Sequence, residues 1–91
     1  MRKSVWKWVL TENDLSTVAM PVGAEILSVH EQMGNVCLWA LVDLDEDRRR
    51  ERTFRIAGTG HVIANCKKLD YIGSVHFMGG SLVFHVFEVR P

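Results

Sequence analysis

The sequence is poor in cysteine and lacks long apolar runs, and both shortages exclude classes of protein. Two cysteines among 91 residues, without CxxC or CxxxC spacing, exclude a disulfide framework, and we expect Cys37 and Cys66 to be reduced thiols. No segment approaches the roughly 18 apolar residues of a membrane-spanning helix. The basic N-terminal stretch is not followed by the apolar region of a signal peptide. We therefore expect a cytoplasmic protein.

The sequence also lacks net charge. Basic and acidic residues both number 11, so no overall positive field exists, and general nucleic-acid binding loses its usual electrostatic footprint. Hydrophobic residues make up 47% of the chain, which indicates a globular domain. A domain this small buries only about 60–65% of the surface of its unfolded chain. We therefore expect a thin core and a homo-oligomer.

Polar and apolar residues mostly alternate with a period of two, which predicts half-buried strands. The expected fold is a single mainly β domain, residues 1–91, with a small antiparallel sheet curled into a barrel or sandwich. At most one short helix is expected, near residues 62–70. The segment "DLDEDRRRER" is a solvated loop or hairpin end, or alternatively an anion clamp where subunits meet.

Two glycine-containing turns predict hairpins. Gly34-Asn35 fits a tight turn whose register stays open. A two-residue turn at Gly79-Gly80 predicts a definite pairing, in which Ser74 faces His85 and Phe77 faces Leu82. One face of this hairpin is then apolar and belongs to the core: Val75, Phe77, Leu82, Phe84 and Val86. The other face is mixed and is either a ligand or subunit surface or a face covered by a loop: Ser74, His76, Met78, Ser81, Val83, His85 and Phe87.

The stretch "FRIAGTGH" is the candidate anion-binding loop. Its glycines can expose backbone N–H groups, and arginine, threonine and histidine add side-chain donors: Arg55, Gly58, Thr59, Gly60 and His61. The stretch is not a phosphate-binding loop or a dinucleotide fingerprint, because those need more glycines and a following helix. A plain turn is the alternative interpretation.

Histidines and aromatic residues complete the candidate site. His76 and His85 share the mixed face, and Trp39 or Tyr71 could stack on a base. Two histidines do not define a zinc site, so we predict no metal and no cofactor. Trp6 and Trp8 fit a core or subunit contact better than a stacking platform.

Enzyme signatures are absent from the sequence. It contains no GxSxG, no HExxH and no histidine followed two positions later by serine or threonine. Its carboxylates gather in one exposed segment instead of standing apart as an acid–base pair. We expect a protein that is not an enzyme.

Several blocks resemble a group of short proteins of unknown function that are encoded by bacteriophages and prophages. The blocks are "MPVGAEILSVHEQ", "CLWALVD", "FRIAGTGH" and "YIGSVHFMGGSLVFHVFE", and the resemblance runs from about Trp6 to Glu88. It implies a small viral protein that acts inside a bacterial cell. Such proteins sometimes sequester a nucleotide signal of host defence, which gives the leading hypothesis of a small anionic, nucleotide-derived ligand. The alternatives are a protein-interaction module that inhibits a host protein, or a virion assembly component.

Overall fold

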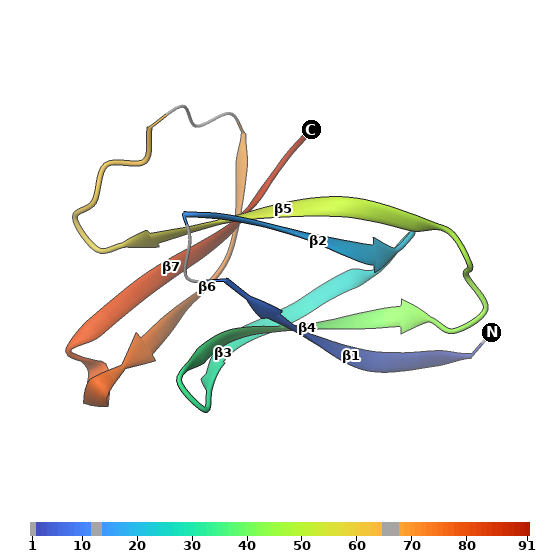
Figure 1. Cartoon of the computed structure of the whole chain (residues 1–91), viewed down its shortest axis with the longest axis horizontal. Helices are drawn as coiled ribbons and strands as arrows, with labels where there is room; N and C mark the ends of the chain where they lie inside the picture. Colours follow the sequence, from blue (N-terminus) through green and yellow to red (C-terminus); the bar gives the residue numbers. More distant parts are fainter. Residues whose placement is uncertain (1, 12–13, 65–67) are drawn as a thin grey trace.

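The computed structural model describes residues 2–11, 14–64 and 68–91, and nearly all of its regular structure is β (Figure 1). The strands are, in chain order, β1 (Lys3–Leu10), β2 (Leu15–Pro21), β3 (Glu25–Gln32), β4 (Asn35–Asp43), β5 (Arg49–Gly58), β6 (Leu69–Phe77) and β7 (Leu82–Val89). One 3-10 turn, η1 (Met78–Gly80), joins β6 to β7. None of the helices in the described part of the chain is long and apolar enough to cross a membrane.

The strands form two antiparallel sheets. The three-stranded sheet has the order β1-β4-β3, and the four-stranded sheet has the order β2-β5-β7-β6. The sheets do not close into one barrel, so the sandwich half of the expectation describes the fold. The expectation of a mainly β domain is confirmed, and the sandwich follows because each sheet has one strongly apolar face to bury.

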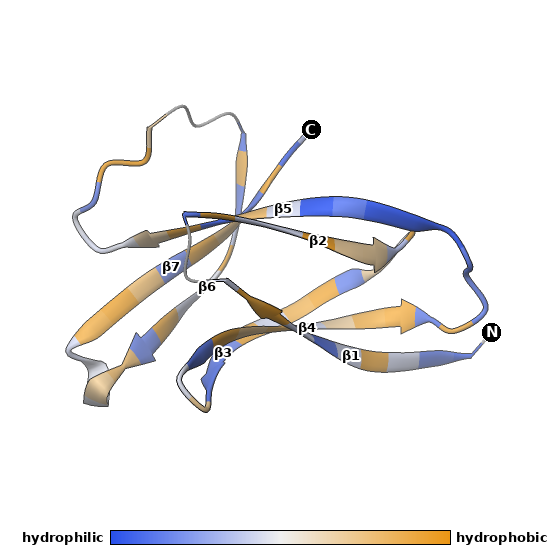
Figure 2. Ribbon diagram, viewed as in Figure 1, coloured by the Kyte–Doolittle hydropathy of each residue, from blue (hydrophilic) through white to orange (hydrophobic). Residues whose placement is uncertain are grey.

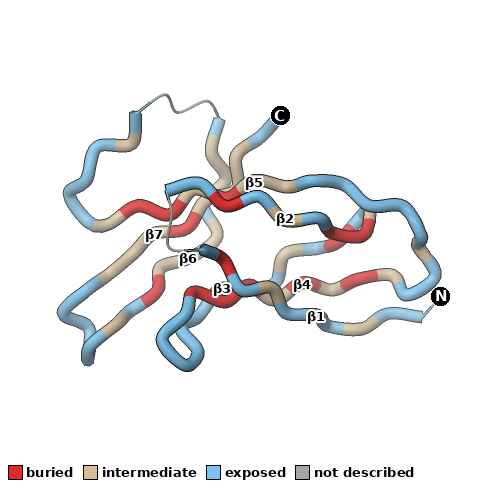
Figure 3. The backbone as a smooth tube through the Cα atoms, viewed as in Figure 1, coloured by how far each residue is buried: buried red, intermediate tan, exposed pale blue. Residues whose placement is uncertain are grey.

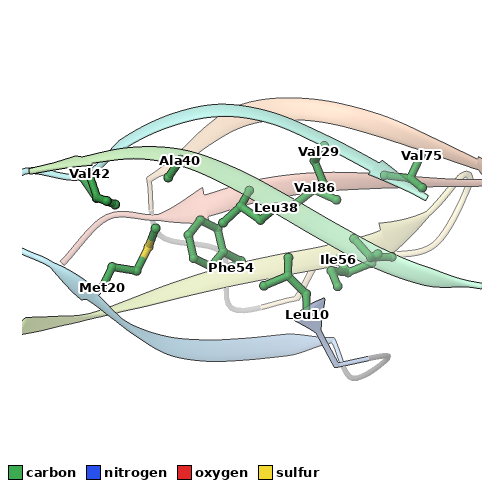
Figure 4. Packing of buried hydrophobic residues seen from close by; sticks show 12 residues of the cluster. Leu10, Met20, Val29, Leu38, Ala40, Val42, Phe54, Ile56, Val75 and Val86 are labelled. Carbon is green, nitrogen blue, oxygen red and sulfur yellow. The ribbon is translucent and has the colours of Figure 1, made fainter. Parts of the chain in front are cut away.

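The core lies between the two sheets and comes from alternate positions of their strands (Figures 3 and 4). Along β4 the inward side chains are Val36, Leu38, Ala40 and Val42, each at most 5% exposed. Phe54 of β5 faces them and is fully buried. Because the pattern has a period of two, both sheets bury one face and leave the other free for function. The start of β5 differs from this apolar core, because hydrophilic residues gather there (Figure 2).

The two sheets come close together at a glycine of β6. A Cβ atom placed on Gly73 would lie 3.0 Å from Cγ1 of Val29, so a larger residue would require the Val29 side chain to shift. Gly73 follows a bulge in β6, where the pairing with β7 shifts between Tyr71 and Gly73. This bulge re-aims the strand before it reaches the mixed face.

The C-terminal hairpin has the predicted register. Ser74 pairs with His85, Val75 with Phe84 and Phe77 with Leu82. Val75 and Val86 are core residues, and both phenylalanines of the apolar face pack against them. Leu82 differs from the prediction, because 46% of it is exposed at the end of the sandwich. The turn involves more than the glycine pair, because Met78, the residue before it, also has a positive φ of 51°.

Three other expectations are corrected or limited by the structure. The first hairpin turns at Met33-Gly34, one residue before the predicted Gly34-Asn35, because Gln32 pairs with Asn35. The expectation of at most one short helix near residues 62–70 agrees with the described residues there, since residues 62–64 are irregular and β6 starts at Leu69, whereas residues 65–67 lie outside the described part. Cys37 is a free, buried cysteine, whereas Cys66 lies outside the described residues.

Candidate functional site: the outer face of the four-stranded sheet

The outer face of the four-stranded sheet gathers most of the predicted site residues. Side chains of paired residues lie on the same face, so the registers place Leu15, Arg55, Phe87 and Tyr71 in one row across all four strands. The next row contains Ala57, His85 and Ser74. The pairing of β5 with β7, which are about 30 residues apart, therefore assembles the site.

A chain of hydrogen bonds crosses this face from the turn after β5, over β7, to β6. His85 bonds through Nε2 to Oγ1 of Thr59 (2.7 Å) and through Nδ1 to Oγ of Ser74 (2.8 Å). Oγ of Ser74 lies 2.7 Å from the hydroxyl of Tyr71. Four polar side chains are thus linked in one line, in which His85 stands between Thr59 and Ser74.

The direction of this chain follows from its end. Oγ1 of Thr59 donates a hydrogen bond to the carbonyl oxygen of Val83 at 3.4 Å, so it accepts the hydrogen bond from Nε2–H of His85. Nδ1 then accepts from Ser74, and Ser74 accepts from Tyr71. A neutral His85 in the Nε2–H tautomer satisfies every group of the chain. The tautomer is inferred from the bond pattern.

The loop "GTGH" is a tight turn with a packed histidine. The amide of His61 donates to the carbonyl of Gly58 at 3.1 Å, and the amide of Thr59 donates to Val83. Gly60 has a φ of +84°, a value that favours glycine. The ring of His61 lies against Gly58, where an added Cβ would come within 2.9 Å of it. Two of these amides are used inside the fold, so the loop offers fewer free donors than an open anion nest.

An arginine-lined depression of about 340 Å³ lies beside this row. Four arginines and two glutamates contribute to its walls: Arg50, Arg52, Arg55, Arg90, Glu51 and Glu88. A second depression of about 410 Å³ shares Arg50, Arg52 and Arg90 and continues toward the β2–β3 connection. The side chains of the first depression carry more positive than negative charge, which suits an anion.

Ion pairs occupy only part of this positive charge. Arg52 donates to both carboxylate oxygens of Glu88 (2.6 and 2.7 Å), and Arg90 does the same with Asp70. The bond from Arg90 lowers the pKa of the Asp70 carboxyl below its ordinary value. Among residues 2–11, 14–64 and 68–91, neither Arg50 nor Arg55 forms an ion pair. These two guanidinium groups are the cations left for a ligand.

Among the predicted site residues, Arg55 has the position that best suits contact with an anion. One of its Nη atoms donates to the carbonyl of Ala64 at 2.9 Å, which fixes the side chain along the loop after β5. Its Nε is buried and has no hydrogen-bond partner in the part of the chain that the structure describes. A guanidinium group with unused donors is suited to a carboxylate or phosphate.

An aromatic pair lies on the same face as Arg55. Tyr71 is 61% exposed and meets Phe87 edge-on, with ring centroids 5.6 Å apart. Phe87 is the direct cross-strand neighbour of Arg55. A cation and an exposed aromatic surface therefore stand side by side.

Two predicted site residues, Trp39 and His76, do not belong to this cluster. Trp39 belongs to β4 of the three-stranded sheet, and it alternates with the core residues Leu38 and Ala40, so it faces away from the core and from the four-stranded sheet. It lies against His30, with ring centroids 5.9 Å apart. His76 shares the outer face of the site but is exposed, paired with Val83 near the hairpin turn.

Sequence reasoning did not single out three residues that the structure brings to the site. Ser74 and Phe87 were assigned to the mixed face without a role, and Arg50 was only one of several arginines in a charged run. The predicted hairpin register already placed Ser74 opposite His85, and the structure adds the hydrogen bond between them. The position of Phe87 beside Arg55 depends on β5 pairing with β7, for which the sequence has no local signal. In the described residues, no three metal-ligating side chains lie close enough to hold a metal ion.

The comparison with known families gives one result. The whole sequence, residues 1–91, matches the model of a family described as a domain of unknown function, DUF7352. No curated protein and no solved structure matches the chain. The chain therefore belongs to the DUF7352 family.

Proposed function

We propose that this protein binds a small anionic, nucleotide-derived ligand without turning it over. The observation that carries the proposal is the row formed by Arg55, Phe87 and Tyr71, which opens beside the arginine-lined depression. In this arrangement Arg55 holds the phosphate groups, and Arg50 adds positive charge to the depression from the opposite face of β5. Phe87 and Tyr71 supply the surface for the base.

The hydrogen-bonded chain prepares the polar part of the same face. His85 is held from both sides by Thr59 and Ser74, so its ring cannot rotate without breaking two bonds. The hydroxyl of Tyr71 ends the chain at an exposed position, from which it can turn toward a ligand. Such fixed groups lower the entropy cost of binding.

The biological setting is part of the proposal. The resemblance to bacteriophage and prophage proteins suggests action in the cytoplasm of a bacterial cell, where stoichiometric capture of a nucleotide signal would oppose host defence. A homo-oligomer fits the exposed apolar residues on the outer face of the three-stranded sheet. Val5 and Val9 of β1 are each about half exposed there, at 51% and 50%. Light scattering tests the oligomer separately from the ligand.

A thermal-shift screen with cyclic nucleotides and ADP-ribose tests ligand binding. A ligand present at 100 times its dissociation constant stabilises the folded protein by about 2.7 kcal/mol. For a domain of this size, that corresponds to a rise in Tm of roughly 10 °C or more. No shift with any of these compounds contradicts the proposal.

The variant Arg55→Gln localises the effect. Loss of a charged hydrogen bond costs about 1.5–3 kcal/mol, so we expect binding to weaken by roughly 10- to 100-fold. The control is Arg2→Gln, which removes an exposed arginine from the ion pair with Asp45, outside the depression. Equal weakening by both variants would refute the role of Arg55.

A further inference from the structure

A third hollow lies at the end of the sandwich where the two hairpins turn. Figure 1 shows the β3–β4 and β6–β7 hairpins turning at this end. The hollow has a volume of about 350 Å³. Its walls come from both hairpins and from β5: Gly34, Val36, Ile56, Phe77, Met78, Leu82 and Phe84.

The lining of this hollow is apolar throughout. None of its residues carries a charge or a polar side chain, in contrast to the arginine-lined depression. Its floor is the core itself, since Val36 and Ile56 are only 5% and 7% exposed. Phe77 and Phe84 form an edge-on pair in its wall, with ring centroids 5.6 Å apart. An ionic ligand would lose its hydration there without a partner.

The rim leaves large apolar groups in contact with water. Met78 is 77% exposed and Leu82 is 46% exposed, and both line the hollow. Met78 also has a φ of 51°, a conformation that glycine or asparagine adopts more readily. A flexible, polarizable side chain at the mouth of an apolar hollow is suited to closing over a ligand.

We propose that this hollow is a second binding site, which takes a neutral two-ring aromatic group of a small molecule. An apolar cavity of about 150 Å³ holds benzene, so a hollow of about 350 Å³ accommodates roughly two fused rings. The two phenylalanines offer edges and faces to such a ring system. The site is separate from the proposed anion site, which lies on the outer face of the four-stranded sheet and shares no lining residue with the hollow.

Titration with indole, followed by NMR of the isoleucine δ1 methyl groups, tests this site. We expect a saturable shift of Ile56, which lines the hollow, and no shift of Ile26, which packs in the core elsewhere. Indole-3-acetate, which adds a carboxylate, should bind at least tenfold more weakly. Absence of a saturable shift at Ile56, or equal binding of both probes, would overturn the proposal.

Two methionines provide a matched pair of variants. Met33 and Met78 are both exposed turn residues with a positive φ, 52° and 51°, but only Met78 lines the hollow. Met78→Asp should weaken indole binding at least tenfold, and Met33→Asp should leave it unchanged. If Met78→Asp does not fold, Leu82→Asp takes its place, with Leu27→Asp as the control at similar exposure. Equal affinities within either pair would contradict the site. Binding of N-acetyltryptophanamide without binding of indole would instead assign the hollow to a protein side chain.

Discussion

The ion pair between Arg52 and Glu88 allows the most quantitative prediction. Its side chains are only 18% and 20% exposed, and Arg52 also donates to the carbonyl of Ala24 at 2.6 Å. Arg52 therefore ties β5 to β7 and to the connection before β3. Its removal would disturb the floor of the arginine-lined depression as well as the fold.

The magnitude follows from this partial burial. Breaking a fully buried ion pair from one side costs about 3–5 kcal/mol, and a fully exposed pair contributes about 0–1 kcal/mol. For a pair that is about one-fifth exposed, we expect Arg52→Met or Glu88→Met to cost about 2–3 kcal/mol each. Each single variant leaves the other charged side chain mostly buried and without its ion-pair partner. The double variant removes both charges and loses mainly the bond to Ala24, about 1 kcal/mol.

Urea unfolding, followed by tryptophan fluorescence, measures these free energies. The expected result is that the double variant is more stable than either single variant, which gives a coupling energy of several kcal/mol in the double-mutant cycle. Equal m-values would show that all variants unfold over the same surface. If the cost of the double variant equals the sum of the single costs, the pair contributes nothing and the reasoning is refuted.

Three further predictions concern the core, a surface ion pair and the hydrogen-bonded chain. Phe54→Ala should lower the free energy of unfolding by about 3–5 kcal/mol, because Phe54 is fully buried between the sheets; a loss below 1 kcal/mol in urea unfolding would place it outside the core. The carboxyl of Glu46 should titrate with a pKa of about 2, because Arg48 donates to it, and Arg48→Gln should return the pKa toward 4.5 in carboxyl NMR. The pair then stabilises the folded state above about pH 4.5, and this contribution disappears as the pH falls through about 2; an unchanged pKa in the variant contradicts the cause. Neutral His85 should show the Nε2–H tautomer in long-range 1H–15N spectra, and Ser74→Ala should weaken that preference; the opposite tautomer would reverse the direction of the chain.

The sequence predicted local structure better than long-range arrangement. The alternation along each strand is a local signal, and the glycines at 79 and 80 fixed the pairing of Ser74 with His85. The other hairpin was one residue out, because Met33 takes a positive φ that the sequence pattern assigns to asparagine or glycine. No local sequence pattern predicts that a methionine adopts a positive φ in a hairpin turn.

The site was only partly visible in the sequence for the same reason. Ser74 and His85 face each other in a hairpin whose register could be derived, so this part of the mixed face was predicted. Tyr71 joins them because the pairing shifts at the bulge between Tyr71 and Gly73, for which the sequence has no local signal. The meeting of Thr59 with His85, and of Arg55 with Phe87, requires β5 to pair with β7 instead of with a sequence neighbour. Trp39 was grouped with the site by residue type alone, and its strand belongs to the other sheet.

Mapping the binding surface by amide NMR tests the central proposal most directly. Titration with ADP-ribose and with cyclic nucleotides should shift amides around Arg55, Tyr71 and Phe87 in a saturable way for at least one compound, and Arg55→Gln should abolish or strongly weaken those shifts. Saturable shifts confined to β1, β3 and β4, or no shifts with any of the compounds, would contradict an anion site on the outer face of the four-stranded sheet.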